Sequence, residues 1–246
     1  MDSKISNVEL LKLYIDSGID EIYNQKPFIY LTESKNPFKE KIKPENNESL
    51  KSMKYVETKA TEIVEKITDI ENLKLAIKNF TDHPLLKFAS NVIVGCGVHN
   101  PKVLVITEHP NDEEDRNGNF LIGNSSDLLT KILFAMNLDI NTNVFAVPFS
   151  PYRPPGDRNL SKEEVSILQP FIKKYIEILQ PKFILTFGSP VNHLLNNDEA
   201  ITTLCGKFHD FMNAKLFPTF SLNYLLNNKD AKKKAWNDLQ ILMKEL

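Results

Sequence analysis

Residues 103–129, VLVITEHPNDEEDRNGNFLIGNSSDLL, join an aliphatic run to a polar segment and then to an amphipathic one. The run over 103–106 is aliphatic throughout and mostly β-branched, which is typical of a strand buried on both faces of a parallel sheet. The segment after Thr107 is rich in Asp, Glu and Gly and is expected to be a loop. Asn124 or Ser125 can cap the helix that follows, whose apolar residues keep helical spacing: Leu128, Leu129, Ile132, Leu133 and Met136. Because ligands of open α/β sheets bind beyond the carboxyl ends of the strands, this loop is the first place to look for a functional site.

The remainder of the chain continues this alternation of strands and helices. Buried strands are predicted at 102–106, 143–147, 182–187 and 215–219, and helices at 124–137, 161–179, 189–196 and 230–245. Strands separated by helices indicate a parallel sheet that is covered on both faces. We therefore expect an α/β fold of three layers, α/β/α, around a central, mostly parallel four-stranded sheet.

The region before residue 80 has a different sequence pattern, without alternating strands and helices. Within residues 1–30 apolar positions recur with helical spacing and predict a helical N-terminal arm, whereas residues 31–53 are rich in Lys and Glu, contain Pro, and predict a flexible linker. Two more helical patterns lie at about 55–68 and 70–80. The expected organisation is an arm, a linker and one α/β domain over 54–246.

Composition is that of an ordinary water-soluble protein. The 246 residues are 41% hydrophobic and 25% charged, with a net charge of −2. No apolar run reaches the roughly 18 to 20 residues that cross a bilayer, and the first residues do not read as a signal peptide. We expect a cytoplasmic monomer with reduced thiols, in which any binding of nucleic acid uses a local basic surface. The two cysteines, Cys96 and Cys205, are too few for a zinc or iron–sulfur site of their own.

Four blocks of sequence carry a resemblance to a known family. The first is the strand followed by Glu108-His109-Pro110, an acidic cluster, and Phe120-Leu121-Ile122-Gly123 before a Leu-Leu helix. The others are YRPPGDR at 152–158 followed by SKEE at 161–164, LQPKFILTFG at 179–188, and PTFSLNYLL at 218–226. In this order they resemble the motifs of family 4 of the uracil-DNA glycosylase superfamily. The resemblance implies the three-layer fold of that superfamily and a DNA substrate that contains a deaminated or damaged base.

The resemblance places catalytic candidates in the segment after residue 107. Glu108 and Glu114 stand where the family has its motif A carboxylates, which act on the sugar side as the N-glycosidic bond breaks. His109 stands where the family usually has Ala, and a neutral imidazole there can take a proton from water. The residues alone leave two simpler interpretations open, a solvated acidic loop and a surface histidine without a role.

The base-binding candidates are Phe120, Leu121, Ser221 and Asn223. Leu121 replaces the stacking Phe of the family, with Phe120 adjacent either to stack or to pack in the core, and Ser221 replaces the His near the leaving base. Pro148 stands in place of the Asn that pairs with the uracil edge, and it offers neither a side-chain donor nor an N–H. We therefore expect excision of uracil to be weak or absent.

Two further differences concern the cofactor and the DNA. The positions of the family's four cluster-binding cysteines hold Phe80, His83, Tyr152 and Leu168, so no iron–sulfur cluster, metal or other cofactor is expected, and an apolar plug is expected in its place. Arg153 and Arg158 flank the retained Pro-Pro-Gly turn. They are candidate DNA-binding residues through phosphate contacts, or solvated cations of a loop.

Three functions are compatible with these residues. The leading hypothesis is a divergent DNA glycosylase of base excision repair that hydrolyses the N-glycosidic bond of a deaminated or damaged base. The second is an inactive descendant that still binds DNA or a base, and the third is an interaction module whose N-terminal arm docks a partner. The motif A carboxylates favour the first, whereas Pro148, Leu121 and Ser221 favour the other two.

Overall fold

The structure, a computed structural model, describes residues 47–246; the arm predicted at 1–30 and most of the linker predicted at 31–53 lie outside this range. The described residues contain a six-stranded sheet of order β1-β3-β2-β4-β6-β5. Its four central strands run parallel: β3 (Val144–Pro148), β2 (Val103–Thr107), β4 (Phe183–Phe187) and β6 (Ala214–Thr219). They are the four predicted strands, each bound lying within one residue of its expected place.

Two short antiparallel strands extend the sheet beyond the prediction. β1 (Cys96–Gly97) pairs with β3, and β5 (His209–Phe211) pairs with β6. The expected number of strands, four, is therefore corrected to six. Segments of two and three residues are too short to show the alternation by which a strand is recognised in sequence.

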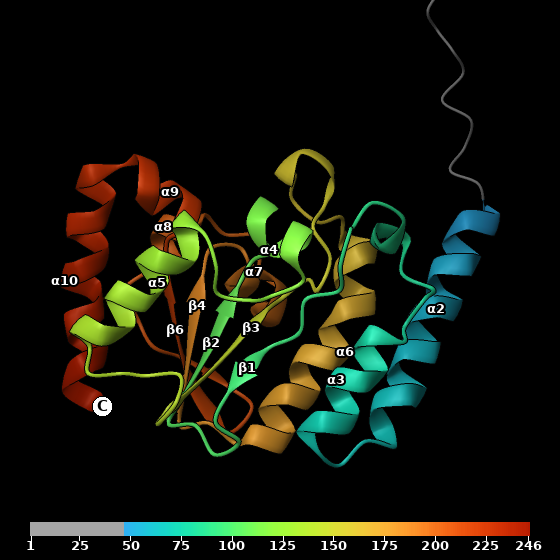
Figure 1. Ribbon diagram of the computed structural model, residues 1–246, viewed down its shortest axis with the longest axis horizontal. Coiled ribbons are helices and arrows are strands. Elements are labelled where there is room, and N and C mark those ends of the chain that lie inside the picture. Colours follow the sequence, from blue (N-terminus) through green and yellow to red (C-terminus); the bar gives the residue numbers. More distant parts are fainter. Residues whose placement is uncertain (1–46) are drawn as a thin grey trace, which may run out of the picture. The chain divides into compact units, whose positions relative to one another are not determined.

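Helices cover both faces of the sheet, which confirms the three-layer α/β/α prediction (Figure 1). One face packs against α2 (Asn47–Glu65), α3 (Ile70–Lys78), α6 (Lys162–Leu179) and α7 (Pro190–Leu195). The other packs against α5 (Asn124–Ala135), α9 (Leu222–Asn227) and α10 (Lys229–Glu245). The shorter elements are α4 (Asp112–Asn117), α8 (Ile201–Leu204) and the 3-10 helices η1 (Pro84–Lys87) and η2 (Pro155–Asp157).

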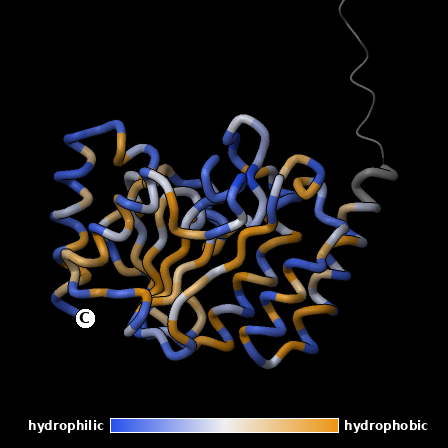
Figure 2. The backbone as a smooth tube through the Cα atoms, viewed as in Figure 1, coloured by the Kyte–Doolittle hydropathy of each residue, from blue (hydrophilic) through white to orange (hydrophobic). Residues whose placement is uncertain are grey.

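The central strands are buried on both sides, as their aliphatic sequences require. All five residues of each of β2, β3 and β4 are buried, and the hydrophobic residues follow the strands and the inward sides of the helices (Figure 2). Burial of each large aliphatic side chain contributes roughly 1.5–3 kcal/mol, so these strands supply much of the folding free energy.

Two helices depart from the sequence-based expectation. α2 begins at Asn47, so residues 47–53, assigned to the linker, are helical. Met53 and Val56 pack against the core beside α6, and such tertiary contacts select a helix where composition alone indicates a linker. α4 lies in the segment expected to be a loop, and its six residues are all polar.

Candidate active site

A hollow of about 450 Å³, including its open mouth, lies over the carboxyl ends of β2 and β4. It brings together six of the residues singled out in the sequence, which come from the end of β2, from α4 and the segment after it, and from α9: Glu108, His109, Glu114, Phe120, Leu121 and Asn223. Figure 1 shows α4 and α9 at the arrowhead end of β2. These six residues therefore lie on one concave surface at the edge of the sheet that its topology indicates.

Glu108 follows β2 directly and is half-buried at the edge of the hollow. Its Oε1 accepts a hydrogen bond of 2.9 Å from the backbone N–H of Ser189, at the start of α7. Gly188 adopts a φ of +80°, and a Cβ there would come within 2.9 Å of Glu108 Cγ. The carboxylate is thus fixed against the end of β4 by backbone geometry, and its second oxygen is left for a ligand.

His109 lies beside Glu108 on the same hollow. Its Nδ1 is 3.1 Å from the carbonyl oxygen of Pro110. Because a carbonyl oxygen only accepts, this contact places the proton of the neutral ring on Nδ1 and leaves a lone pair on Nε2. That tautomer is the one in which Nε2 can take a proton from water.

Glu114 is the most buried acid of the hollow, with 3% of its surface exposed. Its oxygens accept hydrogen bonds from the backbone N–H groups of Asn111 (2.8 Å) and Leu121 (2.9 Å) and from the hydroxyl of Ser126 (2.8 Å). Burial raises the pKa of Glu114, and these donors oppose the rise. The sequence-based hypothesis gave Glu114 a role on the sugar, but its bonding pattern favours a positioning role.

Glu114 also explains why the polar segment after β2 folds into α4. Asn111 and Glu114 form a capping box, in which each side chain accepts a hydrogen bond from the other residue's backbone N–H. Asn111 Nδ2 donates to Ile122 O (2.8 Å) and to Ser125 Oγ (3.0 Å), so the cap is joined to the start of α5. The spacing Asn-x-x-Glu was readable in the sequence, and it is the signal by which α4 could have been found.

The rest of the hollow offers an apolar surface and one amide. Leu121 has a φ of +65°, a conformation that its hydrogen bond to Glu114 helps to hold. Phe120 and Leu121 are half-buried, and they lie with Phe187 on the lining of the hollow. Asn223, in the first turn of α9, is exposed and presents an amide, which has both a donor and an acceptor for the edge of a base.

Sequence reasoning missed several polar groups of the hollow, among them the hydroxyl of Thr107. It is buried at the end of β2, lines the hollow and has no hydrogen-bond partner among the described residues. A polar residue that ends an otherwise aliphatic strand is the signal in the sequence. Pro148 ends the neighbouring strand β3 opposite Thr107, and it lines an apolar cavity elsewhere in the fold.

Ser221 does not lie in the hollow with the other predicted residues. It caps α9 by accepting a hydrogen bond from the N–H of Tyr224 (3.2 Å). It borders an adjacent depression that it shares with Glu108, Gly188 and Tyr224. Glu108 lines both surfaces, so the depression is continuous with the hollow at this residue.

The two arginines proposed as DNA contacts are held by carboxylates. Arg153 Nε is 2.7 Å from Asp157 Oδ1, and its Nη1 is 2.5 Å from Asp112 Oδ1. Arg158 binds Glu164 with both terminal nitrogens, at 2.6 and 2.9 Å. Fork-to-fork pairing of this kind leaves few donors for phosphate, so these arginines join α4, η2 and α6 to one another.

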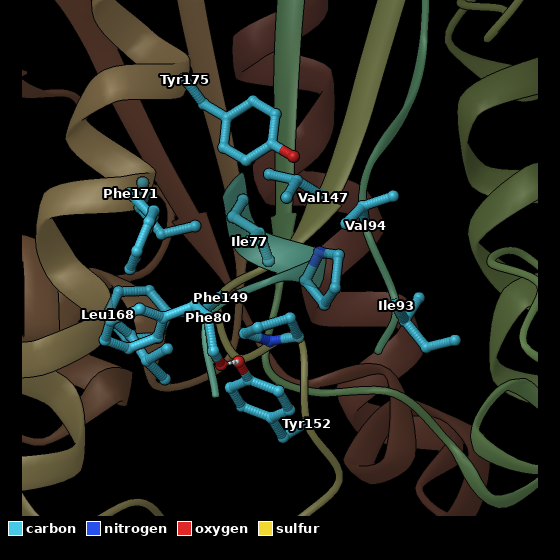
Figure 3. A pocket seen from close by; sticks show the side chains of 13 residues that line it. Ile77, Phe80, Ile93, Val94, Val147, Phe149, Tyr152, Leu168, Phe171 and Tyr175 are labelled. Carbon is cyan, nitrogen blue, oxygen red and sulfur yellow. Dashed lines mark hydrogen bonds between the residues drawn. The ribbon is translucent and has the colours of Figure 1, made fainter. Parts of the chain in front are cut away.

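The four residues that stand where the family has its cluster-binding cysteines lie close together in the fold. Phe80, Tyr152 and Leu168 line an apolar cavity, in which the hydroxyl of Tyr152 donates to the carbonyl oxygen of Phe80 at 3.0 Å (Figure 3). His83 stacks on Tyr152 with ring centroids 4.9 Å apart, accepts at Nδ1 from the N–H of Leu85, and is 1% exposed. Aromatic and aliphatic side chains supply no thiolate, so these residues do not fit an iron–sulfur cluster.

Within 47–246, no three or more His, Cys, Asp or Glu side chains come together in a way that could hold a metal ion. No helix in that range is both long enough and apolar enough to pass through a membrane.

The fold and the hollow define a class of protein. It is an α/β protein with a mostly parallel sheet, whose carboxyl edge carries a hollow lined by carboxylates, an imidazole, an amide and an apolar surface. A sequence profile described as the Uracil DNA glycosylase superfamily matches residues 94–240, more than half of the chain. The protein belongs to this superfamily.

Individual relatives are similar over most of the same region. The chain is 30% identical over 156 residues to a type-4 uracil-DNA glycosylase of Thermotoga maritima, covering 62% of this chain and 81% of the relative. It is 24% identical over 173 residues to a type-4 uracil-DNA glycosylase of Sulfurisphaera tokodaii, covering 67% and 79%. It is also 25% identical over 158 residues to a DNA polymerase of Bacillus phage SP01, covering 64% of this chain and 17% of the polymerase.

Proposed function

We propose that this protein is a DNA glycosylase that hydrolyses the N-glycosidic bond of a deaminated or damaged base and so acts in base excision repair. The observation that carries the proposal is the grouping of Glu108, His109 and Asn223 on one hollow beyond the ends of β2 and β4. The names of its relatives support uracil in DNA as the first substrate to test.

The three groups match the three demands of the reaction. As the bond to the base breaks, the sugar develops positive charge, which the free oxygen of Glu108 can stabilise. Nε2 of His109 accepts a proton from the water that attacks C1′. The departing base carries away the bonding electron pair, and the amide N–H of Asn223 can donate to it. To reach these groups, the nucleotide must leave the DNA stack and place its base against Phe120 and Leu121.

We also propose that uracil is released more slowly than by a family member that retains the Asn and His of its motifs. Pro148 lacks any donor, and loss of a hydrogen bond in a dry site costs about 1–3 kcal/mol. Ser221 caps α9 and supplies no cation, and removal of such an electrostatic group costs about 3 kcal/mol or more. If the two effects add, the rate falls on the order of a thousandfold.

A second candidate is binding without hydrolysis. The observation that favours it is the hydrogen bond that already engages Glu108 Oε1, together with the absence of a donor at Pro148. In that case the hollow holds a base, and the DNA remains intact.

The test is a panel of duplex oligonucleotides, each with one deaminated or damaged base, assayed for abasic sites under excess enzyme. Release of at least one base supports the glycosylase. Selective binding of a base without any abasic product supports the second candidate. If the protein neither binds nor cleaves any member of the panel, both proposals are wrong.

A further inference from the structure

The arginines of the sequence motifs are all paired with carboxylates. The chain has three arginines, Arg116, Arg153 and Arg158, and each pairs with a carboxylate. A glycosylase with a net charge of −2 still needs cations for the DNA backbone. The phosphate contacts must therefore be sought outside the arginine motifs.

Four lysines stand in the six residues that open α10: Lys229, Lys232, Lys233 and Lys234. All four are exposed, and none forms an ion pair with a carboxylate of residues 47–246. Asp230 is the one acid of that run, and Asp238 lies one turn beyond Lys234. We call these four residues the lysine surface.

Two contacts tie the lysine surface to the candidate site. Lys234 Nζ lies 5.5 Å from the ring centroid of Phe220, which lines the depression shared by Glu108 and Ser221. Lys232 Nζ donates to the carbonyl oxygen of Leu226 in α9 at 3.2 Å. Figure 1 shows that α10 begins next to α9, at the same end of the sheet as α4. Lys234 therefore lies beside the depression, and Lys232 lies against α9.

The position of these lysines is unfavourable for the helix itself. Cations near a helix N-terminus oppose the helix dipole, and here Asp230 in the first turn offsets only part of that effect. Residues that oppose local stability are expected where a function requires them. Tyr224, an aromatic residue of the preceding helix α9, is 50% exposed. Exposed lysines together with an exposed aromatic side chain are typical of a surface that binds nucleic acid.

We infer that the lysine surface binds the phosphates of the DNA strand beside the extruded nucleotide. This inference rests on the proposed function. The six residues rise about 8 Å along the helix axis, and a DNA strand presents one phosphate per roughly 3.4 Å of axis, so about two phosphates are contacted. The partner is DNA with an intact backbone, which lies against α9 and α10.

The experiment compares two variants of the full chain with equal charge. In the first, Lys229, Lys232, Lys233 and Lys234 are changed to Gln. In the control, four exposed lysines away from the site are changed to Gln: Lys54, Lys66, Lys173 and Lys244. Binding to a fluorescent duplex with one uracil is measured over a range of salt concentrations.

We expect the first variant to lose on the order of tenfold in affinity at low salt, and its slope of log K against log salt to fall by about two. The control should keep the wild-type slope. Thermal stability of the first variant should stay the same or rise, because the helix loses opposing charges.

Equal affinity and slope for both variants would overturn the inference, as would absence of DNA binding by the wild type at low salt. A third variant, with Arg153 and Arg158 changed to Ala, tests whether the arginines bind the phosphates instead. If this variant alone abolishes the salt dependence, the inference is wrong. Wild-type protein that binds DNA but releases no base would count against the proposed function alone; the lysine surface would then be supported by a weaker affinity and a smaller slope in the first variant than in the control.

Discussion

Oε1 of Glu108 accepts a 2.9 Å hydrogen bond from the backbone N–H of Ser189, which joins the end of β2 to the start of α7. The space for the carboxylate exists because Gly188, at a φ of +80°, has no Cβ. The position of Glu108, the main candidate for catalysis, thus depends on the absence of a side chain at Gly188.

Changing Gly188 to Ala should displace Glu108 and reduce the rate of base excision at least tenfold, because a shift of about 1 Å in a catalytic group can cost that much or more. Left-handed backbone strain should also cost about 1–3 kcal/mol of stability. The matched control is Gly156→Ala, whose φ is +64° and whose added Cβ meets nothing within 4 Å. Equal loss of activity in both variants would show that strain, and not contact with Glu108, is responsible.

Changing Glu114 to Ala should lower the free energy of unfolding by about 2–4 kcal/mol, because the buried hydroxyl of Ser126 and two backbone N–H groups of half-buried residues lose their acceptor. Ser126→Ala removes one of these bonds and should cost about 1 kcal/mol. Urea denaturation measures both. A Glu114→Ala protein of wild-type stability that had lost all excision would contradict the positioning role and favour direct contact with the sugar.

Stability should decrease in mild acid because of two histidines, the buried His83 and the half-buried His193. Burial lowers the pKa of His83 and of His193 to about 4, from the ordinary value of 6.5. Between these values the unfolded chain binds protons that the folded chain does not, so stability is full above 6.5 and is lost as the pH falls toward 4. Each histidine contributes on the order of 3 kcal/mol to this loss.

Urea unfolding at several pH values tests this dependence. His83→Phe should lose a large part of it, whereas His99→Gln, at an exposed position, should keep it. The account of His83 is wrong if its replacement leaves the pH dependence unchanged.

Protein purified without oxygen should be colourless and contain no stoichiometric iron or sulfide, because Phe80, His83, Tyr152 and Leu168 supply no thiolate for a cluster. Tyr152→Phe, which leaves the carbonyl of Phe80 without its donor, should cost about 1–2 kcal/mol of stability. A brown protein with equal amounts of iron and sulfide would contradict this interpretation.

The sheet was the most predictable part of the fold. Strands β2, β3 and β4 are buried on both faces, so their aliphatic runs identify them in the sequence. β1 and β5 escaped prediction because two or three residues are too few to show a periodicity; β1 is defined by pairing with β3, which is distant in sequence, and β5 by a tight hairpin with β6. α4 escaped because its stability comes from a capping box and not from an apolar face.

The location of the hollow was predictable, but the contacts that its residues make were not. Glu108, His109 and Asn223 could be placed together from the topology of the sheet and the motifs. The sequence does not reveal that the oxygens of Glu114 accept hydrogen bonds from Asn111, Leu121 and Ser126. Two of these bonds depend on the path that the chain takes after α4. In the same way, Arg153 and Arg158 read as free cations until their carboxylates are in place.

The most direct test of the glycosylase proposal is single-turnover excision from a uracil-containing duplex and from the best substrate of the panel. Wild-type protein should release the base, and Glu108→Gln and His109→Ala should each slow release about a hundredfold or more, since removal of a general base or of a charge-stabilising group has that effect. The two variants should bind the DNA as wild type does. Base release at the wild-type rate by both variants, or none by the wild type on any substrate, would contradict the assignment of catalysis to this hollow.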